Sequence, residues 1–288
     1  MGVKPLFFFK NIQICKICIL RKDMENIENA KYLKTVIIDK LIENEATEFE
    51  DVTIDESRLN LYLNGEKTIS MMCIPKDQDA HAIGFLMSEN VITSVDDIEE
   101  LTISEDGLRV DVKARINDGS LENLYKEKTL VSGCGGGVTG NIEGSLEIPF
   151  NQTTFKVKPE TISTEVKIFY KESELYYLTG CVHKAMIYLL DGSTITAEDI
   201  GRHNAIDKVV GKCKLQGLDT TQSVLFVSGR LSSEMVTKAV MHRIPIIVSR
   251  TAPTYLGVQV AHKHGITMIG FARGKKMNLY THQGRIDV

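Results

Sequence analysis

Alternating apolar and polar positions run through residues 48–114 and predict short antiparallel strands. Leucines recur at every second position over 59–63, and Asn64-Gly65 then supplies a type I′ turn signal before a second apolar run. Asp106-Gly107 separates two more such runs. The expected elements are strands at 59–63, 68–74, 98–103 and 108–112 and a helix at 81–90. This half of the chain is predicted to be a small α+β domain.

The pattern changes after residue 159, where short apolar runs alternate with helix-like segments. Short buried strands alternating with helices are typical of a three-layer α/β domain. The stretch 145–165 contains Pro149 and Pro159 and is expected to be the boundary between the halves. The expected elements are helices at 183–190, 205–213, 232–242 and 254–263 and strands at 223–227, 246–248, 267–271 and 277–281.

Three segments are therefore predicted: an N-terminal extension at residues 1–45, an α+β domain at 46–158 and an α/β domain at 159–288. No apolar run approaches the roughly 20 residues of a membrane helix. Six cysteines in 288 residues are too few for a disulfide scaffold, so reduced thiols and a cytoplasmic location are expected.

Charge is distributed unevenly along the chain. The net charge is −4, but residues 159–288 hold 16 Lys and Arg against 11 Asp and Glu. This C-terminal part is the better candidate to bind a phosphorylated ligand. Its excess of positive charge is too small for a dedicated DNA-binding protein.

One cysteine, Cys134, lies among four glycines in the stretch 131–138. Glycine contributes no side chain to a core and loses the most backbone entropy on ordering. Such a run fits a loop that must turn sharply, approach a ligand or move. Cys134 is therefore predicted to be a reactive thiol rather than a small core residue.

Each of three predicted strand ends is followed by an arginine: Arg230, Arg250 and Arg273. Ligands of open α/β sheets bind at the carboxyl ends of strands. Helices expected to begin at Ser232 and Thr254 add N-termini, which attract anions. The pattern suggests a phosphate-rich ligand, with ordinary solvated arginines as the alternative.

Two more clusters carry candidate chemistry. Arg273-Gly274-Lys275-Lys276 is the densest basic cluster and suits a pyrophosphate, although a charged turn would look the same. In Gly201-Arg202-His203-Asn204, His203 is followed four residues later by Asp207, so the two are expected to share a helix face and interact. A binding site is preferred there over a salt-linked helix cap.

Three other cysteines differ in how well their predicted positions suit a reactive thiol. Cys181, just before His183, is expected at a helix start, where the helix N-terminus would activate a thiol, so it is the secondary candidate. Cys73 and Cys213 fall within predicted elements and are expected to be core residues. The ligand motifs of a zinc deaminase do not occur, so no metal site is predicted.

Four motifs give the chain a specific resemblance. The sequences at 201–209, 228–236, 252–254 and 270–274 resemble those of the FdhD family, the formate dehydrogenase accessory sulfurtransferases. The resemblance extends over about residues 48–285 and leaves out the N-terminal segment. It implies a C-terminal domain similar to cytidine deaminase without the zinc site.

The resemblance also implies an activity. Members take sulfur from a cysteine desulfurase as a cysteine persulfide and pass it to the molybdenum or tungsten bis(molybdopterin guanine dinucleotide) of formate dehydrogenase. Cys134 matches the persulfide cysteine, and Phe271 to Lys276, with Ala272, Arg273, Gly274 and Lys275, match the cofactor-binding stretch. Arg230, Arg202 and His203 are added as candidate cofactor ligands. A homodimer is compatible with the resemblance.

The glycine-rich loop departs from the family pattern at one position. Where a second loop cysteine is expected, this chain has Gly137. Cys134 then acts alone, or a distant thiol such as Cys181 helps, or the protein mainly carries the cofactor. A single thiolate is chemically sufficient, because it can accept the outer sulfur of a persulfide.

Overall fold

A computed structural model describes residues 30–117 and 148–288, which divide between Asp55 and Glu56 into two compact units. The described part of the first unit is a hairpin of β1 (Leu33–Ile42) and β2 (Glu45–Ile54). The predicted end of the extension at residue 45 thus falls within this hairpin, and the second unit starts later, at Glu56.

The second unit begins with a four-stranded sheet in the order β4-β3-β6-β5 and one helix, α2. The turn between β3 and β4 has positive φ at both Asn64 and Gly65, as the type I′ signal requires, and this predicted hairpin is confirmed. The second predicted hairpin, around Gly107, is confirmed as well. The elements are β3 (Ser57–Leu63), β4 (Glu66–Cys73), α2 (Gln78–Ser88), β5 (Ile98–Ile103) and β6 (Arg109–Ala114).

A six-stranded sheet forms the rest of the unit, in the order β12-β11-β10-β9-β7-β8. Strands β9, β10 and β11 are parallel, whereas β7, β8 and β12 run antiparallel to their neighbours. The strands are β7 (His183–Tyr188), β8 (Thr194–Asp199), β9 (Val224–Val227), β10 (Ile246–Ser249), β11 (Thr267–Arg273) and β12 (Lys276–Thr281). The helices are α4 (Pro159–Lys171), α5 (Glu174–Thr179), α6 (Arg202–Leu215), α7 (Ser233–Met241) and α8 (Tyr255–Lys263).

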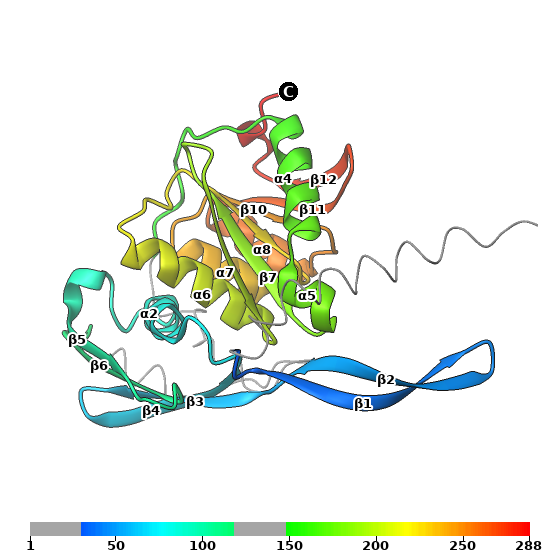
Figure 1. The fold of residues 1–288 in the computed structure, drawn as a ribbon. Helices are drawn as coiled ribbons and strands as arrows, with labels where there is room; N and C mark the ends of the chain where they lie inside the picture. The colour runs from blue at the N-terminus through cyan, green and yellow to red at the C-terminus, as the bar shows by residue number, and fades with distance from the viewer. Residues whose placement is uncertain (1–29, 118–147) are drawn as a thin grey trace, which may run out of the picture. The chain divides into compact units, whose positions relative to one another are not determined.

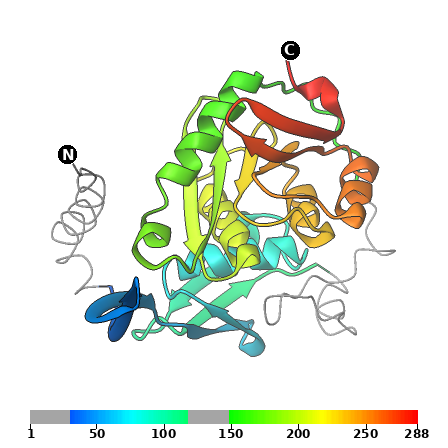
Figure 2. The same cartoon turned by 90° about the vertical axis from the view of Figure 1, so that its right-hand side faces the viewer.

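Helices cover both faces of this sheet (Figures 1 and 2). Apolar side chains of α6, α7 and α8 pack on one face in a large core. Ile162, Val166 and Phe169 of α4 pack on the other, against Phe226 and Val248. The predicted three-layer α/β architecture, with a smaller α+β part before it, is therefore confirmed.

One prediction of secondary structure is wrong. Most of residues 183–190, expected to be a helix, form β7 (His183–Tyr188), and the chain turns at Gly192 into β8. Asp-Gly marks a hairpin turn here rather than a helix end, and pairing with β9 makes the segment a strand. Pro159, in the stretch expected to be the boundary, is the first residue of α4, a position that its fixed φ favours.

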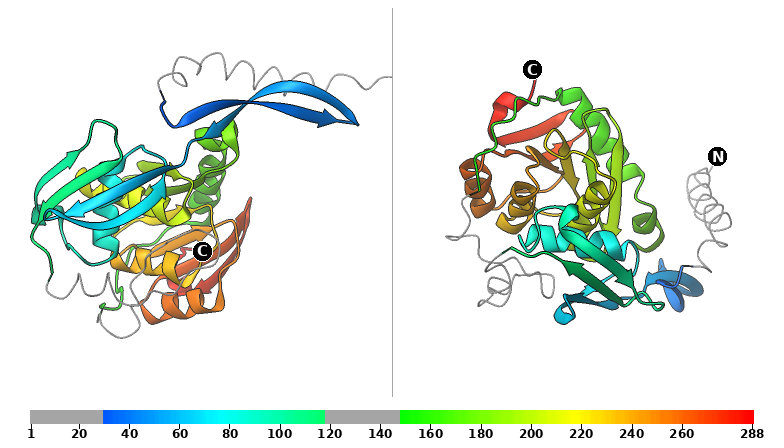
Figure 3. Two further views of the ribbon diagram at one scale, coloured as in Figure 1. Left: turned by 90° about the horizontal axis from the view of Figure 1, so that it is seen from below. Right: turned by 90° about the vertical axis from the view of Figure 1, so that its left-hand side faces the viewer.

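The α2–α6 interface joins the two sheets of this unit, and α2 lies between the four-stranded sheet and α6 (Figures 1 and 3). Glycines allow the close approach: a methyl group at Gly84 would stand 1.9 Å from the main-chain oxygen of Asp207. One at Gly211 would stand 1.8 Å from the oxygen of Ala80. Side chains at these two positions are incompatible with this packing.

Buried charges complete the α2–α6 interface. Lys208 and Asp199 are fully buried, and their Nζ and Oδ2 atoms are 2.6 Å apart. Both also bind the main chain of Ile74, because Lys208 donates to its oxygen and Asp199 accepts from its N–H. Lys238 pairs with Asp207 at 2.7 Å. Every charge of these pairs therefore has an opposite partner, which burial requires.

Candidate functional site

The loops that follow β9, β10 and β11 lie side by side at the carboxyl edge of the parallel strands. Phe271 N–H donates to the oxygen of Thr251 at 3.1 Å, and Arg273 Nε donates to the oxygen of Arg250 at 3.3 Å. Thr251 Oγ1 in turn donates to the oxygen of Gly229 at 2.8 Å. The structure thus brings the arginine-bearing loops into one continuous surface.

Five exposed cations occupy this surface, and we call them the cationic edge: Arg230, Arg250, Arg273, Lys275 and Lys276. None of them forms an ion pair with a carboxylate of the described residues. The N-caps of α7 and α8 follow in the same loops, at Ser232 and Thr254. The edge combines cations with helix N-termini, a setting suited to phosphate groups.

The turn between β11 and β12 presents the basic cluster. Arg273 and Lys276 face each other across the turn, and Gly274 has φ 56° with no atom near its missing side chain. Phe271 is 40% exposed and has φ 51°, an unusual conformation for a bulky residue. Ala272 differs from its neighbours because its side chain is buried in the core.

Arg202 and His203 begin α6 beside this edge, but both are buried. A side chain at Gly229 would stand 3.1 Å from Arg202 Cδ, so Arg202 lies against the loop after β9. His203 Nε2 is 3.0 Å from Glu234 Oε2 at the start of α7. These two residues therefore line the inner side of the edge.

The predicted interaction of His203 with Asp207 is wrong. Asp207 Oδ1 instead accepts from Lys238 Nζ at 2.7 Å and from Ser88 Oγ at 2.6 Å. Both residues belong to α6, but His203 contacts Glu234 of α7, whereas Asp207 contacts Lys238 of α7 and Ser88 of α2. Glu234, which the sequence did not single out, is the carboxylate next to His203.

His183 and Cys181 lie at the start of β7 and not at a helix N-terminus, so the predicted helix contribution to Cys181 is wrong. Cys181 follows Gly180, the C-cap of α5, and its Sγ is 3.4 Å from Thr179 Oγ1. His183 Nδ1 is 3.0 Å from Ser228 Oγ. Burial lowers the pKa of His183, and Arg202 and His203 lower it further, so the neutral imidazole is favoured.

A cavity of about 630 Å³ lies next to this group. It is lined, among others, by Tyr170, Tyr176, Tyr177, Cys181, His183 and Arg250. The Arg250 guanidinium stands 5.2 Å from the centre of the Tyr170 ring. Burial raises the pKa of Tyr170, while Arg250 and Arg273 oppose the rise. Tyr170 is thus within electrostatic range of both arginines, which connects the cavity with the cationic edge.

The cysteines divide as the sequence suggested. Cys73 and Cys213 are buried, and burial raises the pKa of each thiol to about 12. Their thiolates are therefore scarce at neutral pH, and the prediction that they are core residues is confirmed. Cys181 is exposed. Cys134, the main candidate, lies outside the described residues.

Among residues 30–117 and 148–288, no three His, Cys, Asp or Glu side chains come together in a way that could hold a metal ion. No helix within the same residues is long and apolar enough to span a membrane.

Comparison with known proteins decides the family. The FdhD/NarQ family model matches residues 54–287, most of the chain. This chain belongs to the FdhD/NarQ family. A relative named sulfur carrier protein FdhD from Wolinella succinogenes is 55% identical over 259 residues, covering 90% of this chain and 91% of the relative. Sulfur carrier protein FdhD from Bacillus subtilis is 33% identical, covering 85% of this chain and 94% of the relative.

A solved structure from the same family has a similar fold. It is the crystal structure of a formate dehydrogenase accessory protein from Desulfotalea psychrophila, 26% identical to this chain. The TM-score is 0.72, and the match covers 89% of this chain and all of that one. The resemblance noted in the sequence is therefore confirmed at the level of family and fold.

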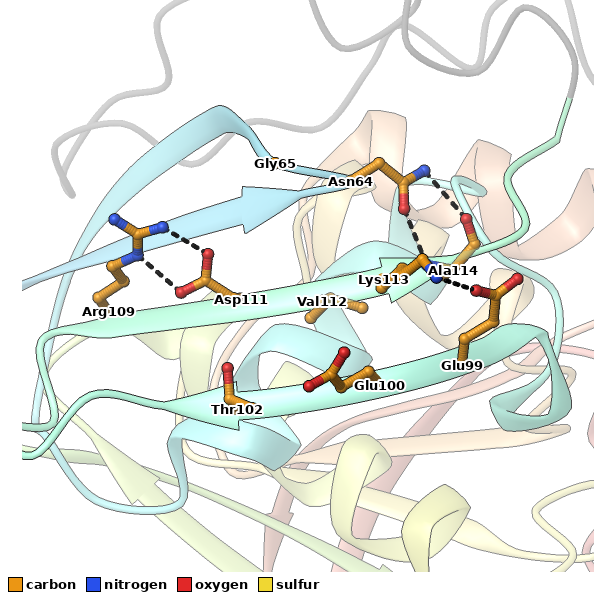
Figure 4. A pocket seen from close by; sticks show the side chains of 10 residues that line it. All are labelled: Asn64, Gly65, Glu99, Glu100, Thr102, Arg109, Asp111, Val112, Lys113 and Ala114. Atoms are coloured by element: carbon orange, nitrogen blue, oxygen red, sulfur yellow. Dashed lines mark hydrogen bonds and ion pairs between the residues drawn. The ribbon is translucent and has the colours of Figure 1, made fainter.

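A second hollow lies on the four-stranded sheet of this FdhD family member (Figure 4). Its charged side chains mostly pair with one another, as in Arg109 with Asp111 at 2.6 Å and Lys113 with Glu99 at 2.8 Å. The Asn64 side chain binds the main chain of Ala114 in both directions. This hollow has fewer charges left for a ligand than the cationic edge.

Proposed function

We propose that this chain is a sulfurtransferase that serves a formate dehydrogenase. It takes sulfur from a cysteine desulfurase as a persulfide on Cys134 and delivers it to a molybdenum or tungsten bis(molybdopterin guanine dinucleotide). Membership of the FdhD/NarQ family and 55% identity to a sulfur carrier protein FdhD support the proposal. The reduced thiols expected from its cysteine content favour the cytoplasm.

The cationic edge is the observation that carries the cofactor half of this proposal. Its five cations have no ion-pair partner among the described carboxylates and converge on one continuous surface. Pyrophosphate groups, as in a guanine dinucleotide, fit such a surface, because arginine binds phosphate oxygens in pairs. Gly274 leaves room for a close approach to the main chain at the turn. In this proposal the cofactor is a substrate that the cationic edge holds, and not a permanent part of the protein.

Cys134 carries the sulfur half. Its thiolate attacks the outer sulfur of the desulfurase persulfide, the sulfur–sulfur bond of the donor breaks, and the desulfurase thiolate leaves. Cys134 then holds the sulfur as a persulfide. When the bound cofactor takes the outer sulfur, the cofactor supplies the electron pair, the sulfur–sulfur bond breaks and the Cys134 thiolate leaves. Cys73 and Cys213 are unsuited to this step, since both are buried with a pKa of about 12.

A second candidate is a carrier that binds the cofactor without transferring sulfur. Gly137 favours it, because the glycine-rich loop lacks the second cysteine of the family pattern. The cationic edge would serve this function equally well. Only the requirement for Cys134 separates the two candidates.

Two variants separate the sulfur half from the cofactor half. Wild-type protein incubated with a cysteine desulfurase and cysteine should gain about 32 Da on Cys134, detected by mass spectrometry. Cys134→Ala should lose this gain and fail to support formate dehydrogenase, yet bind guanosine diphosphate normally. The double variant Arg273→Gln and Lys276→Gln should keep the gain and bind guanosine diphosphate about 10- to 100-fold more weakly.

The outcomes are distinct for each candidate. Active formate dehydrogenase with Cys134→Ala would reject sulfur transfer through Cys134 and leave the carrier function. Unchanged nucleotide binding by the double variant would reject the cationic edge as the cofactor site.

A further inference from the structure

Cys181 combines exposure with a place in a built cavity. It stands between the left-handed C-cap Gly180 and the first residues of β7, and it is exposed. The cavity of about 630 Å³ that it lines also contains Arg250 and Lys171. Reactive cysteines lie in electropositive and partly exposed surroundings of this kind.

The cavity suits a persulfide donor, either a small persulfide anion or a persulfide on a partner protein. Arg250 and Lys171 supply positive charge, and tyrosines on α4 and α5 supply an aromatic wall. Tyr176 and Tyr177 are both more than half exposed, so a partner can reach the cavity past them. These cations attract an anionic sulfur donor, and an approaching chain finds apolar contact area.

We propose that Cys181 is a second sulfur-accepting thiol, which receives sulfur from a protein or low-molecular-weight persulfide in this cavity. The proposal rests on the sulfurtransferase function proposed above. The glycine-rich loop has one cysteine, so a second acceptor thiol lies elsewhere in the chain. Among the described thiols, Cys73 and Cys213 are buried and inert, which leaves Cys181.

The chemical step balances without an added oxidant or reductant. The Cys181 thiolate attacks the outer sulfur of the donor persulfide, RS–SH, and a new sulfur–sulfur bond forms. The old sulfur–sulfur bond breaks, and the donor leaves as the thiolate RS⁻. The proton stays on the transferred sulfur, so Cys181 ends as a persulfide.

The cavity is placed to pass sulfur on. Arg250 belongs both to the cavity lining and to the cationic edge, and its main-chain oxygen accepts from Arg273 Nε at 3.3 Å. A persulfide on Cys181 therefore lies in the cavity that adjoins the surface proposed to hold the cofactor.

Peptide-level mass spectrometry of the full chain tests the proposal. Glutathione persulfide is the donor, and tryptic cleavage after Lys171 and Lys184 separates Cys181 from Cys134. In folded Cys134→Ala, Cys181 should gain about 32 Da at least about tenfold faster than in the urea-unfolded chain, because a cationic cleft concentrates anionic donors. An equal or slower rate in the folded chain overturns the proposal.

Charge variants show whether the cavity, and not exposure alone, sets the rate. Arg250→Gln should slow the gain on Cys181 by about three- to tenfold, whereas Lys167→Gln, an exposed charge of α4 outside the cavity lining, should leave it unchanged. Alkylation of Cys181 by neutral iodoacetamide should be similar in both variants. Equal persulfide rates in the two variants would reject a role for the cavity.

The results for the two cysteines are independent. Labelling of Cys181 without labelling of Cys134 in wild-type protein would reject the proposed role of Cys134 and keep this inference. Labelling of Cys134 alone would do the reverse. Cys181→Ser should lower sulfur delivery to formate dehydrogenase, and circular dichroism checks that the variant folds. Full delivery by this variant would show that Cys181 takes no part in sulfur transfer and would overturn the proposal.

Discussion

The α2–α6 interface and the cationic edge use the same kinds of residue in opposite ways. At the interface, Lys208 and Asp199 are fully buried and satisfy each other and the main chain of Ile74. At the edge, Arg273 and Lys276 stand in solvent with no carboxylate partner among the described residues. Charges that already have partners hold a fold together, whereas charges without them are available to a ligand. Variants at the two places should therefore affect different measurements.

The largest effect is expected at the buried pair. Lys208→Met should lower the free energy of unfolding by about 3–5 kcal/mol, because it leaves the Asp199 carboxylate buried without its cation. Urea denaturation measures the change. Lys212→Met is the matched control: Lys212 pairs with Asp77 in a partly exposed position, and its loss should cost at most about 1 kcal/mol. Equal losses would remove the distinction between buried and exposed pairs.

Acid should weaken the same interface. His81 is fully buried, and burial lowers its pKa to about 4, with Lys208 and Lys238 lowering it and Asp199 and Asp207 opposing them. The unfolded chain binds this proton near pH 6.5, so the stabilisation by neutral His81 is complete above that pH. It is lost as the pH falls from about 6.5 to about 4, by roughly 3 kcal/mol in total.

Unfolding free energies at pH 7 and pH 4.5 test this dependence on His81. His81→Leu should reduce the loss of stability between the two values, while His262→Gln, on an exposed position of α8, should not. An unchanged difference in His81→Leu would assign the acid sensitivity to other groups, such as His242, whose pKa burial also lowers.

The close helix packing should respond to a single methyl group. Gly84→Ala places a carbon 1.9 Å from the main-chain oxygen of Asp207 and should cost about 1–3 kcal/mol, with a lower Tm. Gly284→Ala meets no atom within 4 Å and should change stability by less than about 0.5 kcal/mol. A tolerated Gly84→Ala would mean that α2 and α6 can separate at little cost.

The smallest effect on stability is expected at the cationic edge. Arg273→Gln with Lys276→Gln should change the free energy of unfolding by less than about 0.5 kcal/mol, although the same double variant should weaken nucleotide binding. Thermal unfolding and calorimetric titration with guanosine diphosphate measure the two quantities on one sample. A clear loss of stability would show that the edge is structural and would weaken the comparison.

Local patterns in the sequence were enough for much of the fold. Alternation at 59–63 and the Asn64-Gly65 turn predicted the first hairpin of the second unit, because both signals are contained in a few residues. The segment at 183–188 was misassigned, since a short apolar run fits a helix or a buried strand equally well. Its pairing with β9, distant in the sequence, decides the matter.

The site shows the same limit. The strand-end position of Arg230, Arg250 and Arg273 could be predicted, because parallel strands end at one edge of a sheet. The partner of His203 could not, since spacing along α6 suggested Asp207 while Glu234 comes from α7. A glutamate in the first turn of the next helix was the available signal. The cavity beside Cys181 depends on α4 and α5, neither of which was predicted.

Gly84 and Gly211 also limit how family members can be recombined. A chimaera that takes residues 56–117 from one relative and 148–288 from another must rebuild the close packing of α2 on α6. The main-chain oxygen of Asp207 requires a glycine at position 84 of the donor, and that of Ala80 requires one at position 211 of the recipient. The main chain of Ile74 likewise needs its hydrogen-bond partners, so the recipient must carry both Asp199 and Lys208. The smaller sheet and α2 can therefore be exchanged only between relatives that keep these residues at the α2–α6 interface.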